Sequence, residues 1–137
     1  MKRILCIEDE PQMIDLIKLI LENKGYQVLG AAGGQHGLEM MRVENPDLLL
    51  LDVMMPEMDG GDVLNCMKRE IKLRNIPVII VTARADSIDK VLWMSIAQVD
   101  DYVTKPFGPR DLVESVETVL ANHAELGLET VHDDVLD

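Results

Sequence analysis

The chain has 137 residues, of which 47% are hydrophobic and 28% charged, and its formal net charge is −12. This length fits one globular domain, while the negative charge disfavours direct contact with nucleic-acid phosphates or anionic membranes. No apolar run approaches the roughly 18 to 20 residues of a membrane helix, and the first apolar run is too short for a signal peptide. We therefore expect a cytoplasmic protein that contacts neither nucleic acid nor membrane directly.

The first half of the chain predicts three strands that alternate with helices. The apolar run from Arg3 to Ile7 indicates a strand, and Pro11 then stands at a favourable first position of a helix. Gly25 is the residue type expected where a helix stops in a left-handed turn. Apolar spacing places the other elements. The predicted strands are 3–7, 26–29 and 48–51, and the predicted helices are 12–24, 35–43 and 61–73.

The second half continues the alternation to five strands and five helices. A helix capped by Asp86 or Ser87 carries apolar residues at helical spacing, namely Ile88, Val91, Leu92 and Ile96. Long crossovers between strands predict a doubly wound parallel sheet with helices on both faces. The other predicted elements are a strand at 76–81, a loop at 82–85, a strand around 102–103, a helix at 109–123 and an acidic tail at 124–137.

One stretch, from Asp47 to Gly60, organises the predicted site. Leu48 to Leu51 suit a strand buried on both faces, and Asp52 stands where that strand should end. Ligands of an open parallel sheet bind outside the carboxyl ends of its strands. Taken alone, however, an aspartate at the end of a strand is more often an ordinary loop or capping residue.

The ends of the other predicted strands carry further polar groups. Glu8 and Asp9 follow the first strand, Thr82 follows the fourth and Lys105 follows the fifth. Clustered carboxylates repel one another unless a cation is present, and hard oxygen ligands suit Mg²⁺. A carboxylate can also attack phosphorus, while an ammonium and a hydroxyl can bind phosphoryl oxygens. Together these groups predict a phosphoryl-acceptor site around Asp52, although each alone also fits a helix start, a turn or a surface lysine.

Four sequence strings carry a family resemblance: ILCIEDEP, LLLLDVMMPEMDGG, IPVIIVTA and DDYVTKPF. They resemble, in order and over about residues 3 to 121, the motifs of response-regulator receiver domains in two-component signalling. The resemblance implies an α/β flavodoxin-like fold with strand order 2-1-3-4-5 and five helices. It also implies a regulatory domain, not a turnover enzyme, that is phosphorylated by a histidine kinase or histidine phosphotransfer protein and then binds a downstream protein.

The resemblance also implies roles for single positions. Asp52 would be the phosphoacceptor, and Thr82 and Lys105 would contact the transferred phosphoryl group. The implied metal is Mg²⁺, with Mn²⁺ as an alternative, and Glu8 would act through a metal-bound water. The implied metal-binding residues are Glu8, Asp9, Asp52 and the backbone carbonyl of Met54.

Further implied roles concern switching and the lifetime of the phosphoryl group. Tyr102 would move inward with Thr82 and pass the change to the face of the fourth helix, fifth strand and fifth helix, and the bond before Pro106 would be cis. Met54 and Arg84 occupy the positions that flank the hydrolytic water in the family, and neither is an amide or a carboxylate. We therefore expect slow self-dephosphorylation.

Several readings stay open at this stage. We expect a receiver domain at residues 1–123 that acts by binding a partner, followed by an acidic tail or linker at 124–137. A receiver fragment of a longer response regulator or hybrid kinase is the close alternative. A phosphatase would need a second acid where Met54 stands, and a non-phosphorylated scaffold would not need Asp9, Asp52, Thr82 and Lys105 together.

Overall fold

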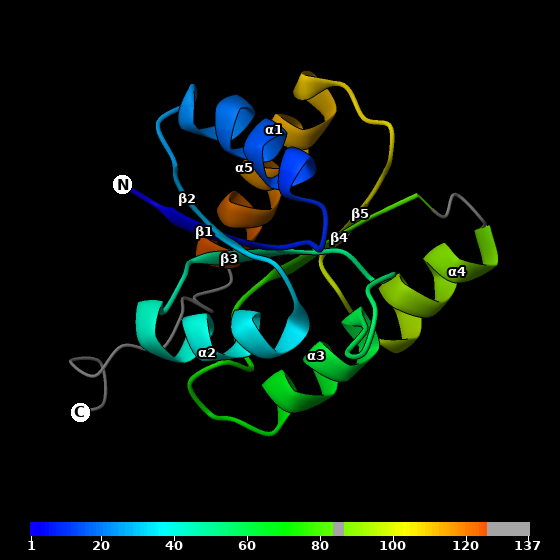
Figure 1. Cartoon of the computed structure of the whole chain (residues 1–137). Helices are drawn as coiled ribbons and strands as arrows, with labels where there is room; N and C mark the ends of the chain where they lie inside the picture. Colours follow the sequence, from blue (N-terminus) through cyan, green and yellow to red (C-terminus); the bar gives the residue numbers. More distant parts are fainter. Residues whose placement is uncertain (84–86, 126–137) are drawn as a thin grey trace.

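Five parallel strands form one sheet, and helices cover both of its faces (Figure 1). The computed structural model describes residues 1–83 and 87–125. The strand order is β2-β1-β3-β4-β5, which confirms the predicted flavodoxin-like fold and its order 2-1-3-4-5. The strands are β1 (Arg3–Ile7), β2 (Gln27–Ala31), β3 (Leu48–Leu51), β4 (Val78–Thr82) and β5 (Asp101–Thr104).

The helices form two layers that enclose the sheet (Figure 1). One layer holds α1 (Pro11–Glu22) and α5 (Pro109–Glu125). The opposite layer holds α2 (Gly34–Glu44), α3 (Gly60–Lys68) and α4 (Ser87–Val91), which continues as the π-helix η1 (Leu92–Ile96). A hydrophobic cluster fills the space under each layer.

The leucine run of β3 belongs to both clusters. Leu49 and Leu51 pack in the cluster under α2 and α3, while Leu48 and Leu50 pack in the cluster under α1 and α5. This alternation follows from the two-residue period of a strand. All four side chains are buried, as expected for a strand in the middle of a doubly covered sheet. The sheet thus places the residue after β3 at its centre.

Most predicted boundaries agree with the structure to within two residues. Pro11 is the first residue of α1, and Gly25 follows that helix with a φ of 93°. Asn45 ends α2 in the left-handed region, with a φ of 52°. The predicted loop at 82–85 is wrong at its first position, because Thr82 is the last residue of β4 and pairs with Thr104.

Helix α3 is shorter than predicted. It ends at Lys68, not near residue 73, and turns follow it. Ile71 is exposed, whereas Leu73 is buried in the cluster under this layer. Because the chain turns after Lys68, helical spacing no longer applies to Ile71 and Leu73 and does not predict which of the two is buried.

The apolar residues predicted for the α4 segment do not face the core. Ile88, Val91, Leu92 and Ile96 are all exposed, and the residues packed against the core are Trp93, Met94 and Ala97. The Ala97 N–H donates to the Leu92 carbonyl at 2.9 Å, a bond across five residues. Such a π-turn shifts the faces of a helix relative to the regular period of 3.6. The exposed apolar stripe is therefore a surface feature.

The remaining predictions concern the ends of elements and the membrane. Helix α5 continues to Glu125, two residues beyond its predicted end. The rest of the predicted tail, residues 126–137, and the predicted cap Asp86 lie outside the described residues. Within residues 1–83 and 87–125, none of the helices combines the length and the apolar character needed to cross a membrane.

Candidate functional site

The carboxyl ends of β1, β3, β4 and β5 place the predicted polar residues along one edge of the sheet. Backbone hydrogen bonds carry the strand pairing one residue further, from Glu8 N to Ala31 O and from Asp52 N to Ile7 O, each at 3.0 Å. The Lys105 N–H likewise donates to the Thr82 carbonyl at 2.7 Å. These hydrogen bonds fix the backbone positions of Glu8, Asp52 and Lys105, from which the side chains of the site project.

Lys105 connects two of the carboxylates. Its ammonium makes a close ion pair with Glu8 Oε1, and its Nζ lies 3.5 Å from Asp52 Oδ2. Both acids are buried, Glu8 with 2% and Asp52 with 6% of its surface exposed. Buried charges are stable only when they are paired. The structure thus brings together three predicted site residues from the ends of three strands.

A second group of carboxylates forms at the end of β1. Oxygens of Glu8, Asp9 and Glu10 all lie within 4.8 Å of one another, and the three side chains range from buried to half-buried to exposed. The Asp9 N–H also donates to Glu8 Oε2 at 3.0 Å. Glu10 was not among the residues predicted for the site. The run of three acids after a strand was the signal that marked it as a further candidate.

Burial dominates the electrostatics of this site. It raises the pKa of the Glu8 carboxyl from 4.5 to about 8; Asp52 acts in the same direction, through its hydrogen bond to Glu8 and its charge, while Lys105 opposes both. Burial lowers the pKa of the Lys105 ammonium, but its hydrogen bond to Glu8 and the charge of Asp52 outweigh that effect, so the pKa is raised. Burial also raises the pKa of the Cys6 thiol to about 12. A cation is therefore favoured beside these carboxylates.

The loop after β3 orients the Asp52 side chain. The Met54 N–H donates to Asp52 Oδ1 at 3.0 Å, on the oxygen that does not face Lys105. The Met54 side chain itself is exposed. Downstream, Asp59 caps α3 by accepting from the Asp62 N–H at 3.0 Å, and the Asp62 side chain accepts from the Asp59 N–H at 3.1 Å. The loop is thus held at both ends.

Three further predictions concern Thr82, Tyr102 and Pro106. Thr82 is fully buried, Tyr102 is buried in the cluster under α2 and α3, and the bond between Lys105 and Pro106 is cis. Arg84, predicted to tune dephosphorylation, lies outside the described residues.

The comparisons with known proteins identify the family. A sequence model described as the response regulator receiver domain matches residues 4–117. This chain belongs to that family. Response regulator receiver domains are regulatory modules of two-component signalling, which agrees with the family that the four sequence strings resemble.

Two curated relatives of this receiver domain are regulators of transcription by name. The chain is 39% identical over 119 residues to the alkaline phosphatase synthesis transcriptional regulatory protein PhoP of Bacillus subtilis, covering 87% of this chain and 48% of that one. It is 35% identical over 130 residues to the phosphate regulon transcriptional regulatory protein PhoB of Klebsiella pneumoniae, covering 95% of this chain and 56% of that one. The chain spans about half the length of these relatives. The predicted absence of a nucleic-acid partner therefore stays a prediction for this chain alone.

Solved structures show the same fold. A signal receiver domain of a histidine kinase from Syntrophus aciditrophicus is 35% identical, with a TM-score of 0.79 over 89% of this chain and 92% of that one. A receiver domain protein described as CheY-like from Methanospirillum hungatei is 34% identical, with a TM-score of 0.81 over 91% and 98% of the two chains. The receiver fold thus occurs both in kinases and in response regulators.

Proposed function

We propose that this receiver domain accepts a phosphoryl group on Asp52 and thereby switches its affinity for a partner protein. The donor is a phosphohistidine on a histidine kinase or phosphotransfer protein. An Asp52 carboxylate oxygen forms a bond to phosphorus while the phosphorus–nitrogen bond breaks, and the imidazole leaves with that electron pair. The observation that carries the proposal is the position of Lys105, which contacts both Glu8 and Asp52 at the centre of the sheet edge.

The surroundings of Asp52 support its role as the nucleophile. Hydrogen bonds from Met54 N and from Lys105 fix the two carboxylate oxygens, so the group needs little reorganisation before it attacks. Lys105 then stands where negative charge develops on the phosphoryl oxygens. We assign Thr82, the buried last residue of β4, to the hydroxyl contact with the same oxygens.

The carboxylates also fit a divalent cation. Glu8, Asp9 and Glu10 offer hard oxygens within 4.8 Å of one another, and the Lys105 ammonium is ion-paired with one of them, Glu8. We propose that Asp9, Asp52 and the Met54 carbonyl hold Mg²⁺ or Mn²⁺ directly and that Glu8 contributes through a water. When bound, the cation offsets the repulsion between these carboxylates and the incoming phosphoryl group.

For the surface that responds to phosphorylation, we propose the face that the family resemblance implies, formed by α4, β5 and α5. Tyr102 is buried on β5, and we propose that it moves together with Thr82 when Asp52 is phosphorylated. The face of α4, β5 and α5 then changes its affinity for a partner. Met54 and Arg84 offer no amide or carboxylate to orient a hydrolytic water, which supports a long-lived phosphoryl group.

Mass spectrometry of the intact protein tests the proposal. Incubation with Mg²⁺ and acetyl phosphate should add one phosphoryl group, about 80 Da. Asp52→Asn should abolish the addition, while Asp15→Asn, at an exposed position on α1, should leave it unchanged. A protein that gains no mass, or that gains the same mass after Asp52→Asn, would overturn the assignment.

A further inference from the structure

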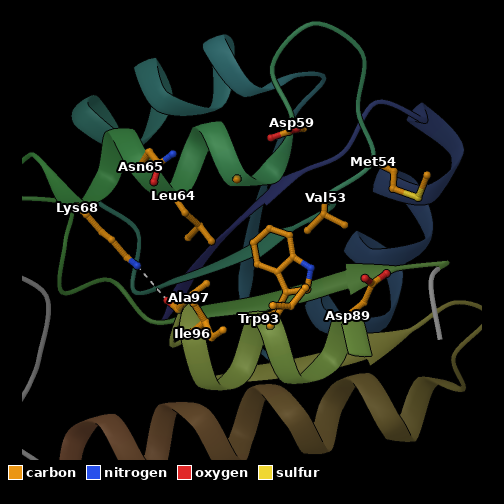
Figure 2. Close-up of a pocket in the computed structure, with 12 residues that line it drawn as sticks. Val53, Met54, Asp59, Leu64, Asn65, Lys68, Asp89, Trp93, Ile96 and Ala97 are labelled. Carbon is orange, nitrogen blue, oxygen red and sulfur yellow. Dashed lines mark hydrogen bonds between the residues drawn. The ribbon is translucent and has the colours of Figure 1, made fainter. Parts of the chain in front are cut away.

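A groove of about 560 Å³ runs between α3 and the α4–η1 helix and is also lined by Val53 and Met54, which follow Asp52 in the chain. Trp93 lies in its middle, with Lys68 at one end and Met54 at the other (Figure 2). The indole reaches across to α3, since its Cη2 lies 3.9 Å from the place that a β-carbon on Gly61 would occupy. We call this feature the α3–α4 groove.

Apolar side chains of the groove are left open to solvent. Leu64 is buried at its base, but Leu92, Ile96 and Met54 are all exposed. Leu92 and Ile96 are residues that the amphipathic pattern of the α4 segment would have buried in the core. Adjacent exposed apolar groups in a groove mark a surface on which another molecule packs.

The walls of the groove favour a helix as the occupant. The lining residues on each wall follow the spacing i, i+3, i+4, i+7, which makes the groove about two helical turns, or about 10 Å, long. Both long walls are helices with internally bonded backbones, so they offer no strand edge to an extended peptide. A helix needs no such edge. The lining residues are Gly61, Leu64, Asn65 and Lys68 on α3 and Asp89, Leu92, Trp93 and Ile96 on α4–η1.

The charges at the ends of the groove favour a basic occupant. Asp59 and Asp89 place two carboxylates at the end near Met54 (Figure 2). Among the described residues that line the groove, Lys68 is the sole cation, and its Nζ donates to the Ala97 carbonyl at 3.0 Å at the opposite end. The segment 126–137 has four acidic residues and no Lys or Arg, so its charge does not complement these carboxylates.

We propose that the α3–α4 groove docks an amphipathic helix of a partner protein, with an apolar face on Trp93, Leu92 and Ile96 and a Lys or Arg side chain beside Asp59 and Asp89. The groove uses the side of α4–η1 that faces α3, whereas the switch face assigned above joins α4 to β5 and α5. The docking is proposed for the unphosphorylated chain.

The test uses Trp93, the single tryptophan of the chain, as a reporter. The probe is a synthetic helical peptide of about 16 residues without aromatic residues, carrying Leu at i, i+3, i+4 and i+7 and Lys at one end of that face. Its addition to the full chain should change the Trp93 fluorescence saturably below millimolar concentration. A peptide with Glu in place of Lys should bind at least about tenfold more weakly, and Asp89→Lys should remove that preference.

Two exposed apolar positions give a matched pair of variants. Ile96 lines the groove and Leu19 lies on α1 outside it, and each has 71% of its surface exposed. Ile96→Ser should weaken peptide binding at least about fivefold, whereas Leu19→Ser should change it by less than about twofold. Peptide binding is measured on the unphosphorylated chain and phosphorylation by intact mass, so failure of this proposal leaves the phosphoacceptor assignment intact.

Three outcomes would overturn the proposal. The first is no saturable change of Trp93 fluorescence with the Lys peptide. The second is an equal effect of Ile96→Ser and Leu19→Ser. The third is a Trp93 signal that depends on protein concentration without peptide and disappears in Ile96→Ser, which would make a second copy of the chain the occupant.

Discussion

On α2, Gly37 packs directly against Ile7 of β1: a β-carbon added to Gly37 would lie 2.3 Å from Cδ1 and 2.6 Å from Cγ1 of Ile7. Ile7 is fully buried, so its side chain has little space into which to move. Gly37→Ala should therefore lower the free energy of unfolding by about 1 to 3 kcal/mol through overpacking. Helix propensity alone would predict a gain of about 1 kcal/mol. Urea unfolding followed by circular dichroism measures the difference.

A double-mutant cycle separates this contact from other effects of alanine. Ile7→Val removes the nearest methyl group and should by itself cost about 0.5 to 1.5 kcal/mol. In the Ile7→Val background, Gly37→Ala should cost clearly less than in the unmodified chain, because the two changes compensate. Additive effects would show that the contact with Ile7 is not the cause.

This contact illustrates what the sequence could not reveal about the fold. At the sequence level a glycine inside a helix indicates only lower helix propensity, and propensity says nothing about the space between a helix and the sheet. The sheet itself was predictable. The run Leu48 to Leu51 predicts a strand buried on both faces, and in the structure its side chains alternate between the two clusters. Gly25, which follows α1 with a positive φ, is the residue type that the end of a helix favours. Local conformation and periodicity follow from the sequence, whereas close contacts between distant residues need the packed structure.

The α4 segment shows where periodicity misleads. Ile88, Val91 and Ile96 have the spacing of a buried helix face but are exposed, and Trp93 packs against the core instead. Spacing identifies one face of a helix but not what that face meets. A face left for a partner gives the same pattern as a face in the core.

The loop after η1 contains a strained residue that can be relieved. Gln98 is exposed and has a φ of 58°, in the left-handed region that costs a non-glycine residue about 1 kcal/mol. Gln98→Gly should raise the free energy of unfolding by about 0.5 kcal/mol, since the added freedom of the unfolded chain offsets part of the relief. Gln98→Ala, which relieves no strain, should not be stabilising. If glycine and alanine have equal effects in urea unfolding, backbone strain at this position is negligible.

Burial of Glu8 should make stability depend on pH in the absence of metal. The folded protein binds this proton up to a pKa of about 8, against 4.5 for an ordinary glutamic acid, so the folded state holds more protons between these values. The resulting contribution to stability is fully present below about pH 4.5 and is lost as the pH rises to about 8. Glu8→Gln stays neutral and lacks this loss. The advantage of the unmodified chain over Glu8→Gln should therefore shrink between about pH 5.5 and pH 8.5.

The measurement is urea unfolding in buffer with a chelator, with Glu22→Gln as the control. Glu22 ends α1 and is exposed, so its removal should leave the slope of stability against pH unchanged. A constant difference between the unmodified chain and Glu8→Gln across the range would contradict the raised pKa.

The candidate site was predictable to the extent that the sheet was. Residues that directly follow parallel strands meet at one edge, and this rule brought Glu8, Asp52 and Lys105 together across long stretches of sequence. It could not rank the contacts within the cluster. That Lys105 pairs most closely with Glu8, and that Glu10 joins the acidic group, depends on side-chain directions that strand order does not determine.

Removal of the Lys105 cation gives the sharpest test of this electrostatic arrangement. Lys105→Met leaves the buried carboxyls of Glu8 and Asp52 beside each other without their positive partner, which should cost about 3 to 5 kcal/mol of stability in metal-free buffer. The loss should be larger at about pH 8.5 than at about pH 6, because protonation of Glu8 relieves the repulsion.

Mg²⁺ should then stabilise Lys105→Met more than the unmodified chain, since a divalent ion no longer competes with the ammonium for the same oxygens. Thermal unfolding with and without Mg²⁺ measures both effects. The control Lys24→Met, at an exposed position after α1, should change neither the stability nor its response to Mg²⁺. If Mg²⁺ stabilises Lys105→Met no more than the unmodified chain, the ammonium and the metal do not share these carboxylates.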